Sequence, residues 1–219
     1  MAKRSTASNP PLGTNPLSAL WLREHKLWSE SGRFSRGKKY WRDRRIRELG
    51  FYSSDLRIEG RVEGSYYNDY WVSYHIEPFS EIEQQKVIEM FKTHPSWLVS
   101  LQHQVVPDEL VPYCEQVGIS LYPSVMGVDC TCPDLANPCK HGVAVALGVV
   151  SALDDDPIEL FHLKGMNLAE LFPQVNAKPA VSSTLAAILE HDYTPAAHPF
   201  DSMEEALEAE VPDLSDSLL

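Results

Sequence analysis

The sequence predicts an α+β fold that combines a small antiparallel sheet, several helices and a zinc site of three cysteines and one histidine (Cys3His). Three observations predict it. Strand-like stretches separated by turns lie between residues 46 and 76, and helix-like stretches follow from residue 80 onward. Three of the four cysteines and one of the eight histidines fall within the thirteen positions 129–141. The chain of 219 residues is 43% hydrophobic, which is enough to build a core.

Alternation of apolar and polar residues predicts three strands, at residues 46–52, 56–64 and 70–76. The segments "SSD" and "SYYND" supply turns between them, so an antiparallel three-stranded sheet is the simplest arrangement. A further strand-like stretch, "ISLYP" at residues 119–123, leads to the cysteine cluster.

Capping patterns predict helices after the sheet. The stretch "SEIEQQKVIEMFKTH" opens with Ser80 and has Glu83 three positions later, which is the spacing of a capping box. Residues 95–104 begin with a proline at an allowed helical position, and residues 107–118 end in a glycine. Both read as short helices.

The segment after the cysteines is apolar on every side. "GVAVALGVVSAL", residues 142–153, is predicted to be a buried element, and its length favours a helix over a strand. Shorter helical pieces are predicted within residues 154–165, 167–172 and 182–191. The run of three aspartates at 154–156 precedes a proline, so a helix cap is favoured over a carboxylate metal cluster.

Charge divides the chain into two halves. Residues 1–61 carry 14 lysines and arginines against 6 acidic residues, whereas residues 62–219 carry 5 against 25. We expect the halves to face different partners. The longest apolar run has twelve residues, fewer than the roughly 18 that span a bilayer, and the amino terminus lacks the apolar core of a signal peptide. The cysteines are too few for a disulfide scaffold, so a cytoplasmic protein with reduced thiols is expected.

Three regions are predicted along the chain. Residues 1–20 form a disordered leader, because prolines, serines, threonines and asparagines dominate its first part. Residues 21–175 form the α+β domain, with the zinc finger at about 126–153. Residues 176–219 hold a helical segment and an acidic tail, whose last 29 residues contain eight acids and no lysine or arginine. Such a tail either docks on a basic surface or keeps the protein soluble.

Cys130, Cys132, Cys139 and His141 make the pattern Cys-x-Cys-x6-Cys-x-His. Zinc prefers four tetrahedral sulfur and nitrogen ligands, and residues two apart on a strand point to the same side, so the first two thiols suit one ion. The last two ligands are expected in the turn that enters the helix. Buried structural cysteines are the alternative, but two paired spacings favour metal. A redox site is disfavoured because the Cys-x-x-Cys spacing is missing.

The predicted zinc is structural. Four protein ligands leave no open position for water or substrate, and three thiolates make the metal a weak Lewis acid. The sequence has no G-x-S-x-G turn, no H-E-x-x-H and no phosphate-binding glycine loop. We therefore expect a protein that is not an enzyme and has no small-molecule substrate.

These residues and their surroundings resemble a known family. "CTCPDLANPCKH" has the order of the SWIM zinc finger, and "GKKYWRDRRI", "RVEGS", "GISLYPS" and "DDDPIELFHLKG" look like the segments around this finger in bacterial SWIM proteins commonly encoded beside Swi/Snf-type ATPases. The resemblance covers roughly residues 30–172. It implies a SWIM-type finger with the four ligands named above, a role in binding DNA or proteins, and a Swi/Snf-type ATPase as partner. Leu135 departs from the family, whose members tend to have an aromatic residue there, so a stacking contact is missing.

Charge indicates where nucleic acid would bind. Lys140 is the only lysine or arginine between Lys92 and Lys164, and Asp129 and Asp134 flank the anionic zinc centre, so phosphates are repelled there. The segment 23–47 instead holds ten lysines and arginines interleaved with aromatic residues. The predicted nucleic-acid contacts are Arg33, Arg36, Lys38, Lys39, Arg42, Arg44, Arg45 and Lys140. The alternative is that the aromatic residues belong to the core and the cations form a solvated face or meet an acidic partner.

The sequence thus predicts a non-enzymatic, zinc-stabilised accessory subunit of a nucleic-acid-processing assembly. It would bind nucleic acid, DNA in the first place, through its basic N-terminal region, and protein partners such as the ATPase. The alternative is a pure protein-interaction scaffold that makes no contact with nucleic acid. No membrane partner is expected.

Overall fold

The predicted α+β fold is confirmed by a computed structural model, which describes residues 10–64, 69–122 and 126–175. Its sheet has four antiparallel strands in the order β1-β2-β3-β4. The strands are β1 (Ile46–Tyr52), β2 (Arg57–Glu63), β3 (Asp69–Ile76) and β4 (Met126–Cys130). The predicted acidic tail, the helix at 182–191 and the first nine residues of the predicted leader lie outside the described residues.

The fourth strand corrects the predicted three-stranded sheet. β4 pairs with β3, so that Val72 lies opposite Cys130 and Tyr74 opposite Val128. The prediction of a strand at 119–123 is wrong for the residues described there, 119–122. Ile119 and Leu121 are buried alternately as a strand would require, but the backbone N–H of the intervening Ser120 donates to the Glu83 carboxylate at 2.9 Å instead of to a strand.

Two helices precede the sheet, α1 (Pro16–Trp28) and α2 (Ser31–Arg42). Asn15 caps α1, since its side chain accepts hydrogen bonds from the backbone N–H groups of Leu17 and Ser18. The helix begins inside the stretch that the sequence predicted as a disordered leader. Leu17 and Trp21 are fully buried, so this part of the leader belongs to the core.

Asp154 holds the chain that leads into α1. Its carboxylate accepts hydrogen bonds from the backbone N–H groups of Gly13 and Thr14, at 2.9 and 2.6 Å, and from the hydroxyls of Thr14 and Ser18. The helix cap predicted for the aspartate run is not found, because the helix that begins at Glu159 has no side-chain cap, although Asp156 accepts from the backbone N–H of Ile158. Asp154 thus joins elements that lie more than a hundred residues apart.

Within the described residues, the predicted helices after the sheet are confirmed. Ser80 and Glu83 form the expected capping box at the start of α3, and Gly118 ends α5 in the left-handed conformation. Cys114 of α5 is fully buried, with its thiol 3.6 Å from the Met90 sulfur. The bounds are α3 (Glu81–Thr93), α4 (Pro95–Gln102), α5 (Leu110–Val117), α7 (Glu159–Leu163) and α8 (Phe172–Val175), with short 3-10 helices η1 (Ser53–Asp55) and η2 (Leu168–Leu171).

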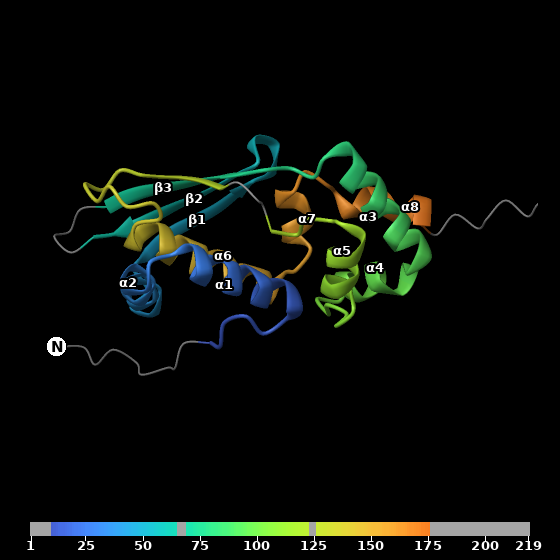
Figure 1. The fold of residues 1–219 in the computed structure, drawn as a ribbon, viewed down its shortest axis with the longest axis horizontal. Helices are drawn as coiled ribbons and strands as arrows, with labels where there is room; N and C mark the ends of the chain where they lie inside the picture. The colour runs from blue at the N-terminus through green and yellow to red at the C-terminus, as the bar shows by residue number, and fades with distance from the viewer. Residues whose placement is uncertain (1–9, 65–68, 123–125, 176–219) are drawn as a thin grey trace, which may run out of the picture. The chain divides into compact units, whose positions relative to one another are not determined.

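The apolar segment predicted as a buried helix is α6 (Lys140–Asp155), the central element of the fold. It lies against the sheet, and α1 and α2 pack on it (Figure 1). Gly37 permits the close approach of α2, because a Cβ atom there would lie 2.5 Å from Val143. The helices α3, α4 and α5 gather beyond one end of the sheet (Figure 1).

A buried histidine joins α1 to the sheet. His25 is 1% exposed, and its ring lies among those of Trp21, Trp28, Tyr74 and Tyr122. Its Nδ1 atom is 3.2 Å from the Trp21 carbonyl oxygen and 3.1 Å from the Tyr122 hydroxyl. Burial lowers the pKa of His25 to about 4, so the ring is neutral at physiological pH.

Candidate metal centre and basic surface

The four predicted metal ligands come together at the junction of β4 and α6. Cys130 is the last residue of β4, Cys132 lies in the following loop, and Cys139 and His141 lie at the start of α6. One ligand atom from each residue lies within 4.8 Å of the other three. The placement of Cys139 and His141 confirms the expected helix entry. Cys132 lies beyond the end of the strand, which corrects the prediction of two ligands on one strand.

The geometry fits a zinc ion. The Nδ1 atom of His141 lies 3.9 Å from the sulfur of Cys130 and 3.9 Å from that of Cys139. A tetrahedral zinc with bonds of about 2.3 Å to sulfur and about 2.0 Å to nitrogen places its ligand atoms about 3.5–3.8 Å apart. Three thiolates and an imidazole are also the donor set that zinc prefers. The site therefore binds zinc with four protein ligands.

His141 offers Nδ1, and not Nε2, to the metal. Nδ1 is the nitrogen that lies 3.9 Å from two of the sulfurs, whereas Nε2 is buried and has no hydrogen-bond partner among the described residues. Tyr70 stacks on the ring with centroids 4.6 Å apart, and Tyr40 meets it edge-on at 5.2 Å. Ring packing therefore orients this ligand, where many zinc sites use a carboxylate or carbonyl on the second nitrogen.

One of the three thiols, that of Cys139, is already arranged to lose its proton. A hydrogen bond from Cys130 lowers the pKa of Cys139 to about 3, with further contributions from His141 and from the backbone N–H of Gly142, whose nitrogen is 3.4 Å from the sulfur. The pKa of Cys130 is raised, first because it holds the proton of that hydrogen bond and then because it is buried. The three thiolates would hold a zinc ion, and its binding would release the remaining protons.

Two contacts brace the site from outside. The buried Tyr74 hydroxyl donates to the Gly142 carbonyl at 2.9 Å and so ties β3 to the first turn of α6. The Asp134 carboxylate accepts from the backbone N–H of Ala136 within the loop and pairs with Arg33 of α2 at 3.1 Å. Neither contact was predicted, because no spacing in the sequence joins these positions.

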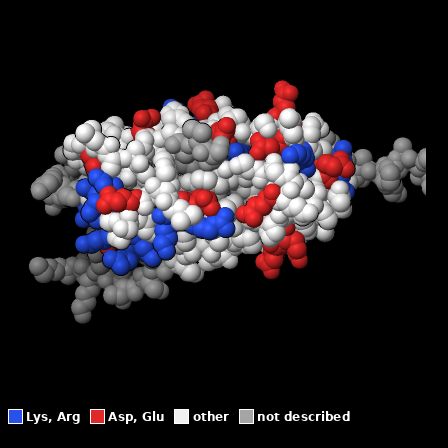
Figure 2. All heavy atoms as spheres, in the orientation of Figure 1, with Lys and Arg blue, Asp and Glu red and all other residues white. Residues whose placement is uncertain are grey.

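The predicted basic surface lies on α2 and the turn after it. Arg36, Lys38, Lys39, Arg42 and Arg44 are all exposed. Figure 2 shows lysine and arginine side chains gathered at the end of the molecule where Figure 1 places α2. Apart from Arg42, these side chains form no ion pair with any residue that the structure describes. Their positive charge is therefore directed to the solvent.

The other three predicted cations have partners within the protein. Arg33 pairs with Glu30 and Asp134. The Arg45 guanidinium lies 4.8 Å from the centroid of the Tyr40 ring and donates to the Gly64 carbonyl, and the Lys140 ammonium is 5.8 Å from the same ring. Two of the three cations thus lie against the Tyr40 ring, whereas Arg33 forms an ion pair with the zinc loop.

A groove of about 590 Å³ runs between α1 and α2. The half-buried rings of Phe34 and Trp41 line it together with Leu147 of α6, and its charged members are Lys26, Lys38 and Arg42. Tyr40, in contrast, is buried against the zinc ligand His141. Of these aromatic residues of the basic segment, one thus belongs to the core and two line a basic groove. The sequence alone did not decide between these two placements.

Comparison with known proteins supports the zinc finger. Residues 115–147 match the family model of the SWIM zinc finger, and this segment contains all four ligands. A protein of Mycobacterium tuberculosis with the name "Uncharacterized protein Rv2102" is 25% identical over 158 residues, which cover 71% of this chain and 56% of that protein. The chain therefore spans little more than half the length of this relative. No solved structure matches it at a significant level.

The described residues include no helix with the length and apolar character needed to cross a membrane.

Proposed function

We propose that this chain is a non-enzymatic accessory subunit in which zinc fixes the β4–α6 junction and the surface of α2 binds nucleic acid. The SWIM zinc finger is a zinc-binding module that mediates interactions with nucleic acids or proteins. The observation that supports nucleic acid is the row of exposed cations on α2 and the following turn, Arg36, Lys38, Lys39, Arg42 and Arg44. Cations of this kind neutralise phosphates and release counterions.

In this proposal the zinc finger supports the fold and does not itself contact nucleic acid. Three thiolates on a zinc dication leave a net charge of about −1, and Asp129 beside the centre is 81% exposed. Phosphates are repelled there, so nucleic acid would approach the exposed cations of α2, the helix that Arg33 joins to the ligand loop. The zinc site would then hold the basic helix in place through α6, on which α2 packs.

Fluorescence anisotropy with labelled single- and double-stranded oligonucleotides tests this proposal. Neutralising Lys39 (Lys39→Gln) should weaken binding and reduce the slope of log affinity against log salt by about 0.7–0.9 if it meets one phosphate. Lys92→Gln is the matched control, because Lys92 is also exposed but lies on α3. Absence of binding at low salt, or equal slopes for the two variants, would overturn the proposal.

A protein scaffold is the second candidate, and the groove between α1 and α2 favours it. An apolar floor with a basic rim suits a peptide whose apolar side chains are flanked by acids. A Swi/Snf-type ATPase is the partner that the flanking segments point to. Co-purification after nuclease treatment separates the candidates, because a scaffold keeps its protein partner whereas an assembly bridged by nucleic acid loses it.

A further inference from the structure

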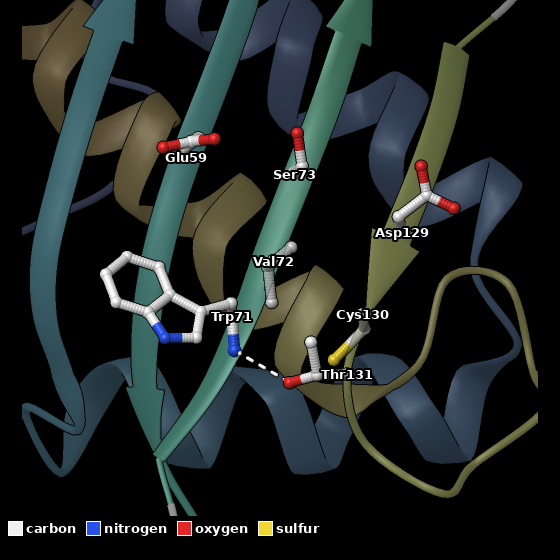
Figure 3. A pocket seen from close by; sticks show the side chains of 7 residues that line it. All are labelled: Glu59, Trp71, Val72, Ser73, Asp129, Cys130 and Thr131. Atoms are coloured by element: carbon white, nitrogen blue, oxygen red, sulfur yellow. Dashed lines mark hydrogen bonds between the residues drawn. The ribbon is translucent and has the colours of Figure 1, made fainter.

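The face of the sheet turned away from α6 carries an acidic pocket with an exposed tryptophan. Side chains alternate between the two faces of a strand, so residues opposite the buried set of β2 and β3 face outward. Figure 3 looks onto this outward face, with the helices behind the sheet. Trp71 is 49% exposed there, although large aromatic residues are usually buried.

Three side chains form a row across the sheet. The strand register places Glu59 of β2 opposite Ser73 of β3, and Ser73 opposite Asp129 of β4. Figure 3 shows the three standing on the outward face, with the Trp71 indole beside the row. Together they line a pocket of about 250 Å³. Because neighbouring strands are about 4.8 Å apart, the two carboxylates are separated by roughly twice that distance across Ser73.

The polar groups of the row keep free capacity for a ligand. The Ser73 hydroxyl oxygen is buried and has no hydrogen-bond partner among the described residues. Glu59 forms an ion pair with Arg57, whose Nε atom lies 3.4 Å from one carboxylate oxygen, and its other oxygen makes no hydrogen bond or ion pair within the described structure. The Asp129 side chain is 81% exposed, and its carboxylate lies 3.4 Å from the exposed imidazole of His75.

The aromatic wall of the pocket is held by the backbone. The backbone N–H of Trp71 donates to the Thr131 hydroxyl at 3.0 Å, and the backbone N–H of Thr131 donates to the Trp71 carbonyl at 3.0 Å. The cation opposite Trp71 on β2 is Arg61, and it is occupied by ion pairs with Glu48 and Asp69. The indole therefore faces the solvent from a fixed strand.

We propose that this pocket binds an arginine side chain of a protein partner. A guanidinium is planar and stacks on an indole, and its donors reach carboxylates on two sides. Here the plane of the guanidinium would lie along the Trp71 indole, with its N–H groups directed to Glu59, Asp129 and the Ser73 hydroxyl. Nucleic acid does not fit, since the two carboxylates repel phosphates. This pocket is distinct from the surface of α2, so the proposal of an arginine site does not depend on the proposed nucleic-acid binding.

NMR of the zinc-loaded full-length protein tests the proposal. The probes are three blocked tripeptides, each with a central arginine, lysine or citrulline between glycines. Citrulline has nearly the shape of arginine without its charge. We expect a saturable shift of the Trp71 indole N–H resonance with the arginine peptide, at least about tenfold weaker binding of the citrulline peptide, and intermediate or weak binding of the lysine peptide.

Variants assign the contacts. Asp129→Asn and Trp71→Ala should each weaken arginine binding severalfold, and Glu81→Gln, an exposed acid on α3, should leave it unchanged. Trp71→Ala could disturb the sheet. In that case Asp129→Asn still tests the proposal, because this substitution alters no apolar contact. Equal shifts with arginine and citrulline, or unchanged affinity in Asp129→Asn, would overturn the proposal. Nucleic-acid binding should persist in Asp129→Asn, which distinguishes the two surfaces.

Discussion

The Arg33 guanidinium of α2 lies 3.1 Å from the Asp134 carboxylate in the zinc loop, 101 residues further along the chain. The hydrogen bond from Arg33 lowers the pKa of Asp134, so the pair is charged at physiological pH. This contact joins the basic helix to the loop that carries Cys132. It also means that one cation predicted to contact nucleic acid has a structural partner.

Replacing Arg33 should therefore affect zinc before it affects nucleic acid. In Arg33→Ala we expect faster release of zinc to a chelator, by less than the roughly 10–100-fold that loss of a direct partner of a ligand causes. The affinity for oligonucleotides should change less than in Lys39→Ala, whose side chain is exposed. Zinc release is followed with a colorimetric chelator. If Asp134→Ala releases zinc at the wild-type rate, the ion pair does not stabilise the loop.

Removal of zinc should loosen one part of the fold and spare another. The ion joins the end of β4 to the start of α6, whereas α3, α4 and α5 have their own apolar contacts, such as those of Met90 and Cys114. Hydrogen exchange after chelation should therefore rise first in residues 126–145. Faster exchange everywhere at once would show that the metal supports the whole fold.

Two glycines of α2 should respond oppositely to alanine. A Cβ atom at Gly37 would lie 2.5 Å from Val143 and 2.9 Å from the Lys140 carbonyl oxygen, so Gly37→Ala must push α2 from α6. We expect a loss of about 1–3 kcal/mol in the free energy of unfolding, despite the better helix propensity of alanine.

Gly32 of the same helix is the matched control. A Cβ atom there meets only the ends of the Glu30 and Arg36 side chains, at 3.4 and 3.7 Å. Gly32→Ala should therefore stabilise the protein by up to about 1 kcal/mol, because alanine loses less backbone entropy in a helix. Urea unfolding measures both variants. Equal effects of the two substitutions would contradict the close packing of α2 on α6.

The zinc ligands and the later helices were predictable because their signals are local. The spacing of Cys130 to His141 and the capping box of Ser80 and Glu83 each lie within a few residues. The helices α1 and α2 were not predicted, because their many charged and aromatic residues obscure the helical spacing of apolar residues. Only the packing of Gly37 on Val143 shows why α2 has a glycine in its middle.

Contacts between distant segments explain the remaining errors. The stretch at 119–123 has the burial pattern of a strand, yet Glu83 of α3 accepts its backbone hydrogen bond. Asp154 looked like part of a local cap, yet it binds Gly13 and Thr14 near the start of the chain. Tyr70, which orients His141, shares no motif with the ligands. Such contacts form only when the chain folds, so no residue spacing in the sequence predicts them.

The buried His25 makes the stability of the fold depend on pH. Its imidazole is neutral in the folded protein because burial lowers the pKa to about 4, whereas the unfolded chain binds a proton at its ordinary pKa of 6.5. A lowered pKa in the folded state gives stability that is complete above pH 6.5 and is lost as the pH falls toward 4. The full loss is ~3 kcal/mol, from the difference between the two pKa values.

Wild-type protein should therefore lose about 2 kcal/mol of unfolding free energy between pH 7.5 and pH 5 through His25 alone. His25→Gln removes the titrating group and keeps a polar side chain beside the Tyr122 hydroxyl, which lies 3.1 Å from the imidazole. This variant should be less stable at pH 7.5 but should lose less on acidification. Urea unfolding at both pH values measures the difference, with zinc content checked because protonation of the thiols also favours unfolding. If both proteins lose the same free energy between these pH values while their zinc is retained, His25 is not the group that couples folding to protons.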